Sequence, residues 1–413
     1  MSAVERRFTR CGPTHYVLDV QDLCLVLDLD RVKRDRWGAL RGELTVRCDL
    51  PGAATIDGNL AWSGEVVLSD TRGRADVIRA LHTRVAARGL NWPLLIDELA
   101  MRVRDAERAG EPAILLRDAR RPAPDETLRV DGLTLLKRHP SIIFGDGGSA
   151  KSYLALYLAG RLDQVGLKVG LFDWELEAED HRLRLEHLFG ATMPGVVYAR
   201  CSRPLVEEAD RLARIIHTHG LSYAVFDSVA FACDGPPESA EVAGNYLRTV
   251  RSFGIGSLHL AHISKSEGGD QKPFGSAFWH NGARATWFAK LAEGNPGDSE
   301  ITLGLFNRKA NLGPRLPAVG FGVRFEAERT TFSRVDLADV SDLASKLSTY
   351  ERITAALKRG PMTVAALADE LDAKADTVEK TIKRWVSKGQ LIRLVANGGT
   401  PTRYGLVESR RAS

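Results

Sequence analysis

The chain has 413 residues, with 57 Lys and Arg against 53 Asp and Glu, and its formal net charge at pH 7 is +4. A hydrophobic content of 44% and a charged content of 27% are typical of a globular protein, and the length predicts two to four domains. No apolar run reaches the ~18–20 residues that a membrane-spanning helix needs, which argues against a membrane protein.

The cysteines and the N-terminal residues predict a cytoplasmic protein. The five cysteines are odd in number and scattered, without a C-x-x-C pair, which is typical of a reducing compartment. The first residues, Met-Ser-Ala-Val-Glu-Arg-Arg, are not followed by the apolar segment of a signal peptide. The mild positive charge is compatible with a nucleic-acid partner but does not argue for one.

Residues 1–120 are predicted to form a small α+β module. The segments 15–18, 23–29 and 40–48 are rich in Val, Leu and Tyr and partly alternate, which predicts strands of an antiparallel sheet. Residues 79–87 and 94–109 have the pattern of amphipathic helices. We find no catalytic pattern here, and the arginines indicate a solvated face rather than a nucleic-acid surface. The charged, proline-containing segment 117–125 is typical of a linker.

Residues 126–335 alternate predicted strands and helices, which indicates a parallel α/β domain. An apolar run at 141–144 enters a glycine-rich turn, and an apolar-periodic segment follows it. The turn matches the P-loop pattern G-x-x-x-x-G-K-[ST], except that Ala150 replaces the last glycine; one methyl group is tolerable there unless φ must be positive. The predicted nucleotide-binding residues are Gly145, Asp146, Gly147, Gly148, Ser149, Ala150, Lys151, Ser152 and Tyr153.

Such a loop directs backbone N–H groups and a helix N-terminus at phosphate groups. We expect Lys151 to reach the β- and γ-phosphates of ATP, and the Ser152 hydroxyl to bind Mg²⁺. The alternative is an ordinary glycine-rich turn between a strand and a helix.

Hydrolysis also needs a second carboxylate near the Mg²⁺ and a group that positions water. Asp227 ends the apolar strand 223–228, as a Walker-B carboxylate does, although a strand-end Asp can simply cap the next turn. Glu175 ends the strand 168–175 and could polarise the attacking water, with Asp173 and Glu177 as competitors. His262 ends the strand 257–262, where it could sense the γ-phosphate or be purely structural.

Four motifs in this order resemble the RecA-type core of RepA-like hexameric helicases. They are Gly145 to Ser152, Phe172-Asp-Trp-Glu175 with Ala178-Glu-Asp180 and Arg182, Val225-Phe-Asp227-Ser, and Leu260-Ala-His-Ile-Ser264-Lys265. The resemblance covers residues 130–330. It implies that Lys151 and Ser152 bind phosphate and Mg²⁺, that Glu175 is the catalytic glutamate, that Asp227 is a Walker-B aspartate that also binds the metal, and that His262 is the sensor.

Related ring ATPases place a Lys-x-Arg pair near the end of the core, reaching into the neighbouring subunit's site. Here the segment reads Arg308-Lys309-Ala310-Asn311, which departs from that spacing. The resemblance makes Arg308 or Lys309 the catalytic finger, which requires a ring or filament. The alternative is a basic turn in solvent.

Two segments are candidates for contact with DNA. In the loop 265–281, Lys265, Lys272 and Trp279 combine cations with an aromatic ring, which suits a single strand in the channel of a ring, whereas the segment 234–241 is acidic. The loop could instead pack its aromatic residues on the core.

The second segment, 345–408, has three predicted helices, 349–358, 364–371 and 376–388, and then a hairpin around Asn397-Gly398-Gly399, which is the plan of a winged helix-turn-helix. Such a module could bind protein instead of duplex DNA. The predicted DNA contacts are Lys374, Thr377, Lys380, Thr381, Arg384 and Arg403.

The expected architecture is therefore a RecA-like parallel-sheet P-loop core at residues 126–335, with an α+β module at 1–120 and a winged helix-turn-helix at 345–408. The first hypothesis is a Mg²⁺-dependent, DNA-stimulated ATPase, a replicative helicase of a phage, plasmid or related mobile element that forms a homo-oligomeric ring. The second is a DNA-binding regulator or recombination mediator that ATP switches without unwinding. A third is a degenerate P-loop protein that binds nucleotide without turnover.

Overall fold

The structure is a computed structural model that describes residues 6–12, 14–35, 37–85, 90–110, 113–121, 126–263, 273, 277–295, 297–311, 313–394 and 401–407. The chain divides into two compact units, Met1–Arg121 and Pro122–Ser413. Within the described ranges, no helix has the length and apolar character to cross a membrane.

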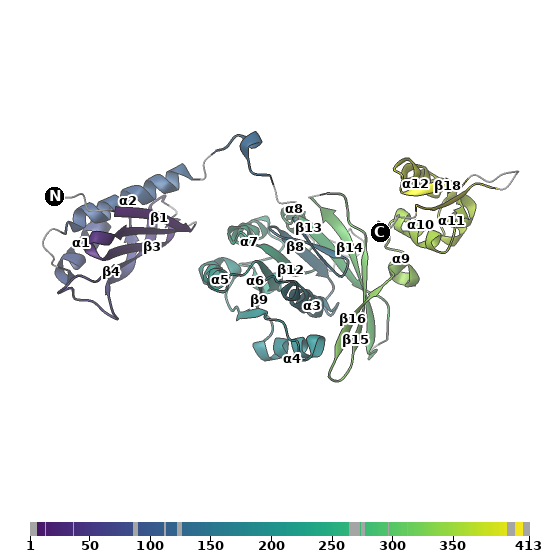
Figure 1. The fold of residues 1–413 in the computed structure, drawn as a ribbon, viewed down its shortest axis with the longest axis horizontal. Coiled ribbons are helices and arrows are strands. Elements are labelled where there is room, and N and C mark those ends of the chain that lie inside the picture. The colour runs from purple at the N-terminus through teal and green to yellow at the C-terminus, as the bar shows by residue number, and fades with distance from the viewer. Residues whose placement is uncertain are drawn as a thin grey trace. The chain divides into compact units, whose positions relative to one another are not determined.

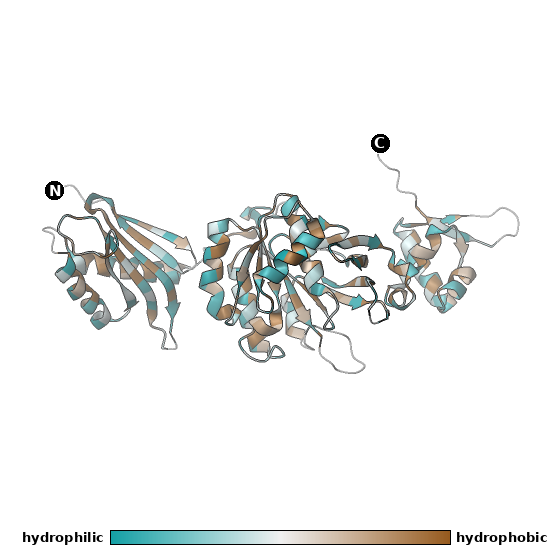
Figure 2. Ribbon diagram, turned by 90° about the horizontal axis from the view of Figure 1, so that it is seen from below, coloured by the Kyte–Doolittle hydropathy of each residue, from teal (hydrophilic) through white to brown (hydrophobic). Residues whose placement is uncertain are grey.

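The first unit is an antiparallel sheet with two helices (Figure 1). Its strands follow one another in chain order, and hydrophobic and polar residues alternate along them, so that one face of the sheet is buried (Figure 2). The elements are β1 (Arg6–Gly12), β2 (His15–Val20), β3 (Leu25–Arg34), β4 (Leu40–Cys48), β5 (Leu60–Val67), α1 (Thr71–Arg84) and α2 (Trp92–Ala109).

The core of this unit joins the inward residues of the strands to both helices. Leu27 and Leu44 of the sheet and Leu81, Trp92 and Leu99 of the helices belong to one buried cluster. The Asp70 side chain accepts from two backbone N–H groups and begins α1, eight residues before the predicted start. Strands β1 and β5 are not predicted from the sequence, because their patterns alternate less regularly.

The second unit contains a nine-stranded sheet with the order β10-β9-β11-β12-β8-β13-β14-β15-β16. Strands β10 to β13 in that order are parallel, and β14 to β16 extend the sheet by antiparallel pairing. The strands are β8 (Pro140–Gly145), β9 (Val169–Asp173), β10 (Val197–Arg200), β11 (Tyr223–Asp227), β12 (Gly256–His262), β13 (Ala285–Leu291), β14 (Glu300–Ala310), β15 (Val319–Phe325) and β16 (Thr330–Val335).

Helices cover both faces of this sheet, and two buried clusters lie between them and the strands (Figure 1). The strands β8, β9 and β11 are buried along their whole length, which is typical of parallel strands covered on both faces. The helices are α3 (Lys151–Gln164), α4 (Ala178–Phe189), α5 (Leu205–His219), α6 (Val229–Ala232), α7 (Ala240–Ser252), α8 (Ala277–Gly282) and α9 (Ser341–Ala344). Strand β16 and a short hairpin of β6 (Thr127–Val130) and β7 (Leu133–Leu136) are not predicted from the sequence.

The C-terminal segment, residues 349–407, has its own small core. Ile353, Leu367, Val378, Ile382 and Leu391 are buried together in it. Its elements are α10 (Thr349–Lys358), β17 (Met362–Thr363), α11 (Val364–Glu370), α12 (Ala375–Ser387), β18 (Leu391–Leu394) and β19 (Arg403–Leu406). The strands pair in the order β17-β19-β18, and the predicted turn at Asn397 to Gly399 lies outside the described residues.

Candidate active site

The glycine-rich turn between β8 and α3 encloses the ammonium group of Lys151. Lys151 Nζ donates to the carbonyl oxygens of Gly145 (3.1 Å) and Asp146 (2.6 Å) and to the Ser149 hydroxyl (3.0 Å). The Ser149 hydroxyl donates to the Asp146 carbonyl at 2.7 Å. Burial lowers the pKa of Lys151, and the nearby carboxylates of Asp227, Asp146 and Glu175 oppose that shift. The cation therefore lies among oxygen atoms that phosphate oxygens could replace.

Two residues of the turn show why glycine is needed. A Cβ atom at Gly145 would lie 2.3 Å from the Ala289 carbonyl oxygen of β13, so a side chain has no room there. Gly148 has a φ of +74°, in the left-handed region that glycine adopts without strain. Gly147 and Gly148 are exposed, and nothing lies within 4 Å of a Cβ added to either, which leaves the outer side of the turn open.

Ala150 has the positive φ at which its methyl group is no longer tolerated without cost. Its φ is +55° and its ψ is +19°, which is the left-handed conformation. A residue with a Cβ atom is less stable in that conformation by about 1–2 kcal/mol. The condition under which alanine is a costly replacement is therefore met, and the surrounding loop and helix α3 hold the residue in place.

Ser152 and Asp227 meet beside the turn. Asp227 ends β11 and is 4% exposed, and the Ser152 side chain lies close enough to act on its pKa. Burial raises the pKa of Asp227 to about 6; the Ser152 side chain opposes the shift, and the charges of Asp173 and Glu175 add to it. A hydroxyl and a carboxylate are hard oxygen donors of the kind that Mg²⁺ prefers, so this pair fits the metal. Among the described residues, no group of three His, Cys, Asp or Glu side chains is placed to hold a metal ion.

The three carboxylates that follow β9 have different surroundings. Asp173 is fully buried and accepts from Glu175 N at 2.5 Å, from Leu176 N at 3.2 Å and from His181 Nε2. Glu177 forms an ion pair with Arg200 at 3.1 Å. Glu175 is exposed and forms no ion pair within the part of the chain that the structure describes. Glu177 is exposed as well, so of the three only Glu175 has a carboxylate that is both exposed and outside any described ion pair.

The pair of Asp173 and His181 is a site feature that the sequence analysis does not find. His181, on α4, is 3% exposed, and its Nδ1 atom has no partner among the described residues. Asp173 pairs in register with Asp227 on the neighbouring strand, so the His181 contact lies one strand away from the carboxylate beside Ser152. The pair fixes the backbone that carries Glu175. Eight residues separate the partners, and nothing in the helical pattern of α4 marks His181 as special.

His262 lies across β12 from the start of the turn. It pairs in register with Gly145, and it is half-buried. Burial lowers the pKa of His262, the Lys151 charge lowers it further, and Glu175 opposes both. Lys151, Ser152, Glu175, Asp227 and His262 therefore gather at the carboxyl ends of neighbouring parallel strands.

The Tyr153 side chain packs away from the turn. Its ring lies edge-on to Phe325 at 5.3 Å between ring centres, and the Arg184 guanidinium lies 4.5 Å from its centre. The Arg184 Nη1 atom has no partner within the described ranges. At Tyr153, therefore, only the backbone N–H can act on a phosphate, and no pattern in the sequence indicates the Arg184 contact.

Arg308 and Lys309 lie near the opposite end of the sheet. Lys309 pairs with Thr286, which in turn pairs with Ile142, three residues before Gly145. Lys309 Nζ donates to the carbonyl oxygens of His280 (2.8 Å) and Asn281 (2.7 Å), whereas the Arg308 guanidinium lies 5.5 Å from the Phe288 ring centre. Neither side chain is part of the Lys151 site of its own chain.

The predicted contacts to a single strand are only partly described. Lys265 and Lys272 lie outside the described residues. Trp279 is fully buried and donates its indole N–H to the Pro237 carbonyl at 2.6 Å, so it does not offer a ring face to a base. We therefore remove Trp279 from the predicted DNA-contacting residues.

In α12, the exposed residues differ from those predicted at one position. Lys374, Thr377, Lys380 and Arg384 are exposed, and so is Arg403 on β19. Thr381 is 9% exposed and donates its hydroxyl to the Thr377 carbonyl at 2.8 Å. Thr381 faces the small core of the segment, and the prediction that it contacts DNA is withdrawn.

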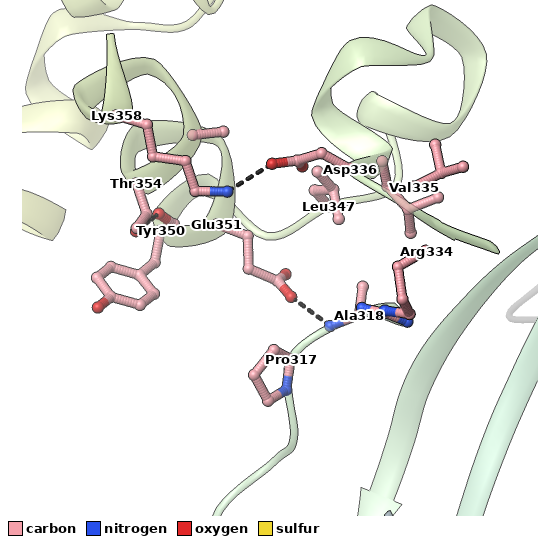
Figure 3. A pocket seen from close by; sticks show the side chains of 12 residues that line it. Pro317, Ala318, Arg334, Val335, Asp336, Leu347, Tyr350, Glu351, Thr354 and Lys358 are labelled. Atoms are coloured by element: carbon pink, nitrogen blue, oxygen red, sulfur yellow. Dashed lines mark hydrogen bonds and ion pairs between the residues drawn. The ribbon is translucent and has the colours of Figure 1, made fainter. Parts of the chain in front are cut away.

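A cavity of about 510 Å³ lies where α10 meets the end of the central sheet (Figure 3). Glu351 accepts from Ala318 N at 2.7 Å, and Lys358 forms an ion pair with Asp336 at 2.5 Å. None of its lining residues belongs to the Lys151 site, so the cavity is a joint between β15, β16 and α10 and not a place for the nucleotide.

Among comparisons with known proteins, only those with solved structures give matches, and these are likenesses of fold. No family model matches the sequence, and no curated protein matches it. A solved structure described as the ATPase domain of another protein is similar over 58% of this chain and 98% of that chain, with 12% identity and a TM-score of 0.40.

Proposed function

We propose that the chain is a Mg²⁺-dependent ATPase stimulated by DNA, and that it acts as a replicative DNA helicase of the RepA-like type, from a phage, plasmid or related mobile element. The observation that carries the proposal is that Ser152 and the buried Asp227 lie together beside a buried Lys151. A hydroxyl, a carboxylate and a lysine at the end of a parallel sheet are the groups that hold a nucleotide triphosphate and its metal.

In this proposal Lys151 binds the β- and γ-phosphates, and Ser152 and Asp227 bind Mg²⁺. Glu175 positions the attacking water, because its carboxylate is exposed and the backbone beneath it is fixed by Asp173. His262 lies between the phosphate turn and the loop that follows β12, so it can report the state of the γ-phosphate to that loop.

The assembly in the proposal is a hexameric ring in the cytoplasm. A finger from a neighbouring subunit completes each site. Arg308 is the better candidate, because the Lys309 ammonium group already donates to two carbonyl oxygens of its own chain. The loop with Lys265 and Lys272 contacts single-stranded DNA in the channel. The C-terminal segment acts as a winged helix-turn-helix on duplex DNA, through Lys374, Thr377, Lys380, Arg384 and Arg403.

The competing function is that of a DNA-binding regulator or recombination mediator, which ATP switches without unwinding. The exposed, acidic segment after α6 favours it, because Asp234 and Glu238 repel a DNA strand close to the proposed channel. Strand displacement from a forked DNA substrate separates the two functions. ATP turnover that single strands stimulate, without any displacement, would support the regulator and contradict the helicase.

The catalytic assignment is tested with Glu175→Gln. We expect ATP turnover to fall by about 10²–10⁴-fold, because the carboxylate that polarises water is lost while the shape is kept. Binding of a fluorescent ATP analogue should stay within about twofold of the unmodified chain, since uniform binding does not depend on the catalytic carboxylate. Glu177→Gln is the matched control, since Glu177 is paired with Arg200. If Glu175→Gln and Glu177→Gln have equal turnover, Glu175 is not the catalytic residue.

A further inference from the structure

Four cations meet at the end of the central sheet opposite the phosphate turn. They are Arg138 in the turn before β8, Arg251 near the end of α7, Arg284 just before β13, and Lys309 on β14. We call these four residues the Arg284 cluster. They are far apart in the sequence and come together through strand register, since Ala285 pairs with both Ser141 and Ala310.

Main-chain contacts fix the cluster around the turn that follows α8. Lys309 Nζ donates to the carbonyl oxygens of His280 and Asn281, and Arg251 Nη2 donates to the Gly282 carbonyl at 2.5 Å. Arg284 N donates to the Pro140 carbonyl at 3.1 Å, which ties the residue after Arg138 and His139 to the same turn. Three elements therefore present cations from a rigid base.

The cluster has little negative charge to balance it. Within the described ranges, none of its four members forms an ion pair. Burial lowers the pKa of Lys309, and the charges of Arg284 and Arg251 lower it further. His139 shows the same field: burial lowers its pKa most, Arg284, Arg251 and Arg138 each lower it further, and Glu126 alone raises it.

The cluster is open on its outer side. Arg138, Arg251 and Arg284 are exposed, while Lys309 is half-buried beneath them. Holding like charges together costs free energy, and a bound anion would offset that cost. Guanidinium groups match the oxygens of a phosphate in particular, because they donate two parallel hydrogen bonds.

We propose that the Arg284 cluster binds phosphate groups carried by a partner molecule. The phosphates are those of the backbone of a nucleic-acid strand, since the proposed function already assigns Arg308 to the nucleotide of a second copy. The site of the same chain is not the source, because Ala285 and Ala289, which flank the cluster and the turn, are about 13 Å apart along β13. The inference rests on the proposed function and adds a second anion site to it.

The test uses the full chain with Arg138→Gln and Arg284→Gln combined. Both side chains are exposed and neither donates to another described residue, so the fold should be kept. The control is Arg129→Gln with Lys346→Gln, which removes two exposed cations elsewhere in the same unit. A variant with Arg138→Lys and Arg284→Lys keeps the charge and should recover most of the lost function.

A backbone phosphate predicts a change in binding of a fluorescein-labelled oligothymidine of about 20 nucleotides, long enough to span several phosphate contacts. Its affinity at low salt should fall about tenfold, and the slope of log affinity against log salt should fall by about 1.4, which corresponds to two lost phosphate contacts. ATP turnover without DNA should then match the control.

If the cluster instead binds the nucleotide of a second copy, the result is reversed and the proposal is overturned. Turnover should fall about tenfold or more with the affinity for the oligothymidine unchanged. Mixing this variant with Lys151→Ala should restore turnover, because an intact cluster then faces an intact turn across the contact between copies. An affinity of the double variant for the oligothymidine equal to that of its control contradicts the proposal, whatever its turnover. The proposed ATPase is tested separately, by the turnover of Lys151→Ala. If Lys151→Ala hydrolyses ATP normally, the ATPase site is wrong, whereas the oligothymidine affinity of the cluster variant still decides the present proposal.

Discussion

Lys151, which is buried, and Lys309, which is half-buried, lie at opposite ends of one sheet. Each donates to main-chain carbonyl oxygens, and burial lowers the pKa of both. Their surroundings have opposite sign: carboxylates of Asp227, Asp146 and Glu175 act on Lys151, whereas Arg284 and Arg251 act on Lys309. The hydrogen bonds of a lysine do not reveal its role. The charges around it do, since one end is suited to a metal with its phosphates and the other to an anion alone.

The largest expected effect is the loss of ATP turnover when Lys151, and not Lys309, is replaced. Lys151→Ala should lower ATP turnover by about 100-fold or more, because a charge that stabilises the transferred phosphoryl group is lost. Lys309→Ala should change turnover without DNA less than about tenfold, but it should lower the free energy of unfolding by about 1.5–3 kcal/mol, since two charged hydrogen bonds are lost. Turnover assays and urea denaturation of both variants measure this contrast. Equal loss of turnover in the two variants would contradict it.

The second prediction concerns the buried carboxylates at the His181 contact. His181→Ala leaves Asp173 buried with a missing partner, which should lower the free energy of unfolding by about 3 kcal/mol. Turnover should fall as well, because the Glu175 backbone loses its support. Tyr198→Phe is the control: it removes a hydroxyl that bonds the Leu176 carbonyl nearby, and should cost about 1 kcal/mol. A His181→Ala variant as stable as Tyr198→Phe would show that the pair is unimportant.

The third prediction uses pH to examine Asp227. Burial raises its pKa from 3.8 to about 6. At pH values between these two, the folded chain therefore keeps a proton on Asp227 that the unfolded chain releases. Stability from this group is therefore lost as pH rises from about 4 to above 6. Asp227→Asn should stabilise the nucleotide-free chain by about 2–3 kcal/mol at about pH 8 and by little at about pH 4, while turnover is lost. Urea denaturation at both pH values tests this, and an equal effect at the two would contradict it.

The smallest effect is expected at Ala150. Glycine removes the strain of the left-handed conformation, and Ala150→Gly should raise the free energy of unfolding by about 1 kcal/mol. The loss of the alanine's restriction on the unfolded chain offsets part of this gain. Thermal denaturation with Ala155→Gly as the helix-interior control, which should destabilise, gives the comparison. A destabilising Ala150→Gly would mean that the turn adopts another conformation in solution.

Strand ends are the part of the site that the sequence can predict. Apolar runs that finish in Asp227 or His262 bring those side chains to one edge, because parallel strands end together. Burial along β8, β9 and β11 follows from the same runs. The conformation of Ala150 is not predictable in this way, because a loop pattern does not state its dihedral angles.

Contacts between distant residues account for the other failures. Trp279 has a side chain suited to stacking on bases, yet it packs on Tyr246 and bonds the Pro237 carbonyl, 42 residues away. His181 and Asp173 meet only because α4 folds back over the end of β9. The Arg284 cluster likewise depends on the pairing of β13 with β8 and β14, and no local pattern contains that information.

Glu351 connects the start of α10 to the residue that precedes β15. One of its carboxylate oxygens accepts from Ala318 N, and the other accepts from the Ser348 backbone in the cap that begins the helix. One carboxylate therefore protects both backbone N–H groups, that of Ser348 before α10 and that of Ala318 before β15, from exchange with solvent. Amide hydrogen exchange at Ser348 and Ala318 should accelerate together when Glu351 is replaced by Ala, so that two sites about 30 residues apart in the chain open as one unit.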